Sequence, residues 1–135
     1  MRFLLDTDAA IALIKAKPQA VEWLRRRAPS EVVLSGVSKA ELYFGARKSE
    51  RVEHNLGVLY RFFEPFGSLA FDDRAAEEYG IIRADLERAG TPIGPNDLLI
   101  AALARSRDLT LVSFNQREFG RVAGLRLADF DTPDS

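Results

Sequence analysis

The side chains in this sequence that could carry polar chemistry are mostly carboxylates. The 135 residues include no cysteine and a single histidine, His54. Disulfides, thiolate zinc sites, cysteine nucleophiles and histidine-rich metal sites are therefore excluded. Carboxylate oxygens prefer hard cations such as Mg²⁺ or Mn²⁺. Four oxygen-bearing side chains have the type and the chain positions for such a site: Asp6, Glu41, Asp97 and Asn115.

The elements that must position these side chains alternate along the chain. Short apolar or β-branched runs predict strands at residues 2–5, 32–34, 69–71 and 110–113, with a fifth at a sheet edge at residues 126–127. Helical patterns cover residues 9–15, 20–27, 37–48, 50–63, 73–89 (closed by Gly90) and 95–105. Such alternation predicts a three-layer α/β/α domain with a mostly parallel sheet of four to five strands. Residues 1–130 are expected to form this single domain, and residues 131–135 a flexible tail.

A parallel sheet would gather the four candidate residues. Asp6 directly follows the first predicted strand, and Asn115 comes two residues after the fourth. Glu41 lies on the helix after the second strand, and Asp97 lies in the first turn of the helix that Pro95 opens. Because ligands bind beyond the carboxyl ends of parallel strands, we expect all four side chains at one edge of the sheet.

Each candidate taken alone also has a purely structural explanation. Asp6 could cap the helix that follows, which is worth about 1 kcal/mol, although Thr7 or Asp8 could do the same. Asp97 could complement a helix dipole, a contribution of roughly 0.3–1 kcal/mol. Asn115 could be an ordinary turn residue. The argument for chemistry therefore rests on the four together.

Glu41 is harder to explain structurally. It shares a helix face with Val37, Phe44 and Gly45, so we expect it to face the core. Asp97 shares a face with other apolar residues: Ile100, Ala101 and Ala104. An unpaired buried carboxylate costs several kcal/mol in practice, and neighbouring carboxylates raise one another's pKa. A divalent cation would offset both effects, and it could activate water for phosphodiester hydrolysis without histidine or cysteine.

Four segments of the chain resemble a known family. They are Leu4-Leu-Asp-Thr-Asp8, Ser38-Lys-Ala-Glu-Leu-Tyr-Phe-Gly-Ala46, Pro92-Ile-Gly-Pro-Asn-Asp-Leu-Leu-Ile-Ala-Ala102, and Leu111-Val-Ser-Phe-Asn-Gln-Arg-Glu-Phe119 followed by Gly124-Leu125. In this order and spacing they are similar to the PIN-domain ribonucleases, and within them to the VapC toxins of toxin–antitoxin pairs. The resemblance covers nearly the whole chain.

The resemblance implies a function and a set of site residues. It implies an α/β/α fold, Mg²⁺-dependent cleavage of RNA with Mn²⁺ as a substitute, a homodimer, and inhibition by a VapB-type antitoxin encoded beside the toxin. Asp6, Glu41 and Asp97 match the family's first three acidic positions and are the expected metal-binding residues. Asn115 stands where the family often has Asp, which puts a tightly held second metal in doubt. Glu118, one helical turn further on, is not expected to bind the metal directly.

Two other functions remain open from the sequence. The Asp6-Thr7-Asp8 segment resembles phosphatases that form an aspartyl-phosphate, but Ala10 stands where those have Thr or Val, and no lysine follows Lys48. A non-catalytic PIN-like module that binds RNA or protein is the other alternative. Its support is the missing fourth carboxylate.

Charge and hydropathy limit how the chain could bind nucleic acid and where in the cell it is expected. The net charge of -1 excludes binding of nucleic acid by bulk charge alone. Basic clusters at residues 25–27 and at Arg47, Lys48 and Arg51 are either RNA contacts or solvated helix faces. The aromatic-rich segment 56–66 is a candidate core, dimer or partner surface, and no role is assigned to His54. Without a signal peptide or about 18 consecutive apolar residues, we expect a cytoplasmic protein that makes no membrane contact.

Overall fold

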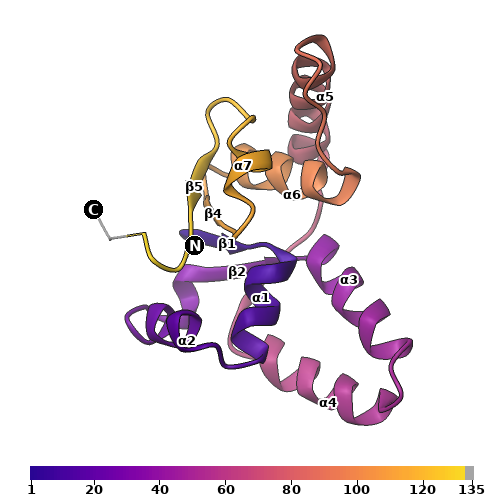
Figure 1. Ribbon diagram of the computed structural model, residues 1–135, viewed down its shortest axis with the longest axis vertical. Helices are drawn as coiled ribbons and strands as arrows, with labels where there is room; N and C mark the ends of the chain where they lie inside the picture. The colour runs from indigo at the N-terminus through magenta and orange to yellow at the C-terminus, as the bar shows by residue number, and fades with distance from the viewer. Residues whose placement is uncertain (133–135) are drawn as a thin grey trace.

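The computed structural model describes residues 1–132 and has three layers, with a parallel sheet between two groups of helices (Figure 1). All strand pairings are parallel and the strand order is β3-β2-β1-β4-β5. The strands are β1 (Phe3–Leu5), β2 (Val32–Ser35), β3 (Gly67–Leu69), β4 (Thr110–Val112) and β5 (Arg126–Ala128). The predicted α/β/α fold is confirmed, and the fifth strand lies at an edge as expected.

The helices divide between the two faces of the sheet (Figure 1). One face carries α1 (Thr7–Ile14), α2 (Pro18–Arg25), α3 (Gly36–Arg47) and α4 (Val52–Phe63), and a short 3₁₀ turn, Pro29–Glu31, precedes β2. The other face carries α5 (Asp73–Arg88), α6 (Pro95–Ser106) and α7 (Gln116–Phe119). No helix within residues 1–132 is long and apolar enough to cross a membrane.

The alternation of side chains along β1 divides the core in two. Phe3 and Leu5 pack on the α1–α4 side, where Trp23 is fully buried, while Leu4 packs on the α5–α7 side. Successive strand residues point to opposite faces, so a strand buried on both sides needs an unbroken apolar run. The run Phe3–Leu5 meets this requirement, as expected for the central strand of the sheet.

The third strand is two residues earlier than predicted. Residues 69–71 were expected to form it, but β3 is Gly67–Leu69. Phe71 leaves the sheet and its ring packs edge-on against Tyr79 of α5, while Asp72 accepts a hydrogen bond from Ala75 N and so begins that helix. A Cβ at position 67 would lie 3.2 Å from a methyl of Val33, so glycine lets this edge strand approach β2.

Most helix ends fall within two residues of their predicted places. Asp6 and Ser35 cap α1 and α3, so both helices begin before the predicted residue 9 or 37. Gly90, at φ +71°, follows the end of α5 as expected for a left-handed cap. Helix α7 was not predicted. In the proposed tail, Asp131 and Thr132 bond to Asp129, and residues 133–135 lie outside the described part of the chain.

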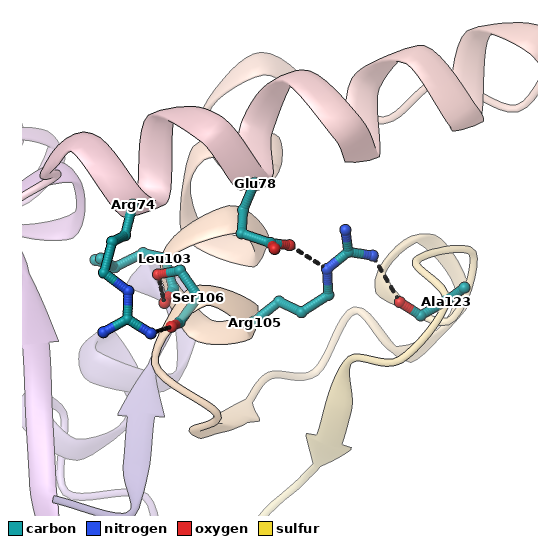
Figure 2. Close-up of polar contacts among 6 residues, drawn as sticks. All are labelled: Arg74, Glu78, Leu103, Arg105, Ser106 and Ala123. Carbon is teal, nitrogen blue, oxygen red and sulfur yellow. Dashed lines mark hydrogen bonds and ion pairs between the residues drawn. The ribbon is translucent and has the colours of Figure 1, made fainter.

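Polar contacts fix α5 against α6 and thereby hold the helix that carries Asp97 (Figure 2). Arg105 Nε lies 2.5 Å from Glu78 of α5, and its Nη1 donates to the carbonyl oxygen of Ala123 at 2.9 Å. Arg74 of α5 donates to the carbonyl oxygen of Ser106 at the end of α6. These bonds, together with the apolar surface between the two helices, anchor the carboxyl end of α6.

Candidate active site

The candidate residues lie where the sheet order reverses. From β1 the chain proceeds through β2 to β3 on one side, whereas β4 and β5 add on the other side of β1. In open parallel sheets a ligand crevice forms at this switch point, beyond the carboxyl ends of the two central strands. Asp6 directly follows β1, and Ser113 and Asn115 follow β4. We call this region the acidic edge, defined by Asp6, Glu41, Asp97, Asn115 and Glu118.

Asp6 is the most deeply buried carboxylate of the acidic edge, with 4% of its surface exposed. Its Oδ1 accepts a hydrogen bond from Ala9 N at 2.8 Å, so it does cap α1. Burial raises the pKa of Asp6 from 3.8 to about 6. Hydrogen bonds from Ser113 and Ala9 oppose this rise, and the charges of Asp8 and Asp97 add to it. Helix capping accounts for the position of one carboxylate oxygen of Asp6. It does not account for the burial of this carboxylate beside other negative charges.

Asp97 reaches the same edge from the first turn of α6. It is half-buried, and the three residues that share its face, Ile100, Ala101 and Ala104, are buried as predicted. Burial raises the pKa of Asp97, and the charges of Glu118 and Glu41 raise it further. Asn115 Nδ2 lies 3.5 Å from Asp97 Oδ2 and partly compensates the charge.

Glu41 reaches the acidic edge from α3, but not in the way the sequence indicated. Thr7 donates a hydrogen bond to Glu41 Oε1 at 2.8 Å. The expectation that the stripe shared with Phe44 faces the core is wrong, because Phe44 is 66% exposed. The buried side of α3 is instead formed by Ser38, Leu42 and Ala46. Glu41 therefore stands half-buried beside a groove.

Asn115 holds Glu118 at the acidic edge. Its Nδ2 lies 2.8 Å from Glu118 Oε2, and its Oδ1 accepts from the backbone N–H of Glu118 as the cap of α7. An amide nitrogen can only donate, so the Asn115 side chain links two acceptors, Asp97 and Glu118. A fourth carboxylate therefore stands beside the position where the sequence lacks one.

All four predicted residues thus converge on one edge, while His54 lies exposed on α4. Three neighbours were not assigned to the site from sequence: Thr7, Ser113 and Glu118. A polar residue next to a strand end is the only local signal for Thr7 and Ser113. Within residues 1–132, no three or more His, Cys, Asp or Glu side chains form a group able to hold a metal ion as they stand.

A groove opens onto the acidic edge from the α1–α4 side. Its volume is about 490 Å³, and it runs between α1 and the pair α3 and α4. Thr7, Asp8 and Glu41 line it together with the basic residues Lys15 and Lys48. An extended ligand lying in this groove would therefore have direct access to Glu41.

The sequence as a whole matches a known family. The family model for the PIN domain covers residues 3–125, a span that contains every residue of the acidic edge. This chain belongs to the PIN-domain family. A related PIN protein, the tRNA(fMet)-specific endonuclease VapC of Shigella flexneri, is 43% identical over 130 residues, which are 96% of this chain and 98% of that protein. The predicted resemblance to VapC is confirmed.

Solved structures of VapC-type PIN proteins share the fold. DNA-bound VapBC from Salmonella typhimurium aligns with a TM-score of 0.89 and 42% identity, covering 96% of this chain and 98% of that chain. VapBC2 from Rickettsia felis, bound to a promoter DNA fragment, aligns with a TM-score of 0.91 and 33% identity, covering 97% and 100%. The likeness therefore extends over the full length of the PIN domain.

Proposed function

We propose that this PIN protein is a metal-dependent endoribonuclease that hydrolyses RNA phosphodiesters as the toxin of a toxin–antitoxin pair. The observation that supports this best is the accumulation of unneutralised negative charge around buried Asp6. Among the ion pairs between residues 1–132, none joins an Arg or Lys to Asp6, Glu41 or Asp97. Relatives named as ribonucleases and endonucleases support the same activity.

The oxygen ligands at the acidic edge are of the type that a hard divalent cation such as Mg²⁺ or Mn²⁺ prefers, although the described side chains do not form a ready-made metal site without it. Asp6 and Asp97 would hold the cation, and Glu41 would bind it or orient a water molecule at the site. A bound cation supplies charge neutralisation and polarises a substrate phosphate. The protein's own part is to place Asp6 by the turn after β1, Asp97 by the first turn of α6, and Glu41 by helix α3.

Glu118 supports a catalytic rather than a purely binding role. A PIN-like module that does not cut RNA was suggested by Asn115, which lacks the charge of the aspartate often found there. With Glu118 Oε2 2.8 Å from Asn115 Nδ2, the acidic edge still has four carboxylates. We assign Glu118 the charge-supplying role of that fourth position, with Asn115 as the residue that holds it.

The partner would be a VapB-type antitoxin that inhibits the nuclease. The aligned structures from Salmonella typhimurium and Rickettsia felis are described as VapBC bound to DNA, which supports a complex of this kind. The related protein named tRNA(fMet)-specific endonuclease makes initiator tRNA the first substrate to test. Formation of a homodimer by this chain, which the family resemblance implies, remains a prediction.

Cleavage of initiator tRNA and of total RNA by the purified chain tests this function. We expect cleavage with Mg²⁺ or Mn²⁺, none after EDTA, and recovery when metal is restored. The Asp97→Asn variant, purified identically, controls for contaminating nucleases. Cleavage that survives EDTA, or that Asp97→Asn retains in full, would contradict the proposal. Recovery of an aspartyl-phosphate at Asp6 would favour the phosphatase alternative.

Metal binding should depend on pH because Asp6 must lose a proton to bind a cation. With the pKa of Asp6 raised to about 6, the proton is already lost at pH 7 and is retained below pH 6. Below pH 6 the apparent Mn²⁺ affinity should therefore fall by about tenfold per pH unit. Isothermal titration with Mn²⁺ between pH 5 and 7.5 measures this. A flat profile in the wild-type chain would exclude Asp6 from the site.

A further inference from the structure

Thr7 connects two parts of the acidic edge that lie far apart in sequence. It is the first residue of α1, and its Oγ1 lies 2.8 Å from Glu41 Oε1 and 3.1 Å from Ser38 Oγ, both on α3. The three residues lie in two different elements, so the contacts exist only when α1 and α3 pack together. No sequence motif required them.

The chemistry of the groups sets the direction of these hydrogen bonds. An ionised carboxylate only accepts, and a threonine hydroxyl has a single proton to give. Thr7 therefore donates to Glu41, and the Ser38 hydroxyl is left to donate to Thr7. Ser38 is completely buried, and its backbone N–H bonds to Ser35 Oγ at 3.0 Å, which fixes it in the first turn of α3.

The position of Thr7 itself is fixed by the turn that precedes it. Thr7 directly follows Asp6, whose side chain accepts from Ala9 N and whose carbonyl oxygen accepts from Ala10 N at 3.0 Å. The turn that places the Asp6 carboxylate thus also places the Thr7 hydroxyl. A change in the position of one would change the other.

We propose that Thr7 is a positioning residue that holds the Glu41 carboxylate at the acidic edge. The inference rests on the proposed function, because it assigns Glu41 to the same cleavage site. Glu41 stands half-exposed beside an open groove, and its negative charge acts on the neighbouring carboxylate of Asp97. A glutamate that can rotate freely would turn toward water and away from that charge. The hydrogen bond from Thr7 keeps it in place before any cation binds.

Removal of the hydroxyl without a change in side-chain size tests this role. Thr7→Val should lower kcat about tenfold at saturating Mg²⁺, the loss expected for one hydrogen bond to a charged group. KM for RNA should stay the same, and Mn²⁺ affinity measured without RNA should weaken. Thr7→Ser restores the hydroxyl and should retain wild-type values. Thr110→Val, at the opposite end of the sheet, is the matched control and should change neither quantity.

A double-mutant cycle with Glu41 distinguishes loss of the Thr7–Glu41 hydrogen bond from a general loss of packing around Thr7. In a Glu41→Ala background, Thr7→Val should weaken Mn²⁺ binding no further, because the acceptor is already gone. Additive losses would overturn the inference, as would wild-type kcat in Thr7→Val or an equal defect in Thr7→Ser. If Thr7→Val does not fold, Thr7→Ala replaces it. A wild-type chain that neither binds Mn²⁺ nor cuts RNA would instead reject the proposed function.

Discussion

Asp6→Asn should abolish metal-dependent cleavage and at the same time stabilise the metal-free protein. The activity loss follows because a neutral amide at the most buried position weakens cation binding. A bound cation contributes several kcal/mol of charge stabilisation to the reaction, so we expect the cleavage rate to fall by at least about 100-fold. The cap of α1 should survive, because asparagine accepts from Ala9 N as well as aspartate does.

The gain in stability follows from the direction of the pKa shift. The pKa of Asp6 is about 6 in the folded chain, against an ordinary value of 3.8. Between these values the folded state binds more protons than the unfolded state, so stability falls as pH rises through this window. At pH 7 the ionised carboxylate costs the folded state at most about 3 kcal/mol. Asparagine removes this cost, and the melting temperature in EDTA should rise by several degrees.

Asp72→Asn is the matched control. Asp72 also caps a helix, accepting from Ala75 N at 3.0 Å, but that bond and the guanidinium of Arg107 lower its pKa. Its replacement should therefore lower stability and leave cleavage unchanged. Thermal unfolding in EDTA and initial cleavage rates measure both effects. An active Asp6→Asn variant, or one destabilised like Asp72→Asn, would contradict the assignment.

The sequence predicts the layers of the fold better than the ends of its elements. Apolar runs and helical spacing are local signals, and they were sufficient for the parallel sheet and its flanking helices. Strand β3 was misplaced because Gly67 and Ser68 have little preference for strands and join the sheet only by pairing with β2. Helix α7 has four residues, too few to show a period.

The topology explains why the site was more predictable than its contacts. Parallel strands place Asp6 and Asn115 at one edge whatever the details of packing. The bond between Thr7 and Glu41 spans 34 residues and depends on how α1 meets α3, which periodicity does not specify. Periodicity likewise shows that Glu41 and Phe44 share a face, but not that the adjacent face of Ser38, Leu42 and Ala46 is the one that packs on the core.

Asn115→Asp should have opposite effects on the metal-free and metal-bound protein. The Asn115 amide donates to Glu118 at 2.8 Å and lies 3.5 Å from Asp97, whose pKa is already raised by burial and by neighbouring charge. A carboxylate there loses a donor and adds a like charge, so the metal-free chain should lose about 1–3 kcal/mol of stability. The same added charge attracts a cation.

Mn²⁺ affinity should therefore increase by about tenfold or more, since 1.4 kcal/mol of added attraction suffices for this. Gln19→Glu is the control, because it adds a carboxylate at an exposed position of α2, outside the acidic edge and its groove. That variant should bind Mn²⁺ as the wild type does. Urea unfolding in EDTA and Mn²⁺ titration give the two quantities. Unchanged affinity in Asn115→Asp would place Asn115 outside the site, and unchanged stability would mean that its amide does not hold Glu118 and Asp97 together.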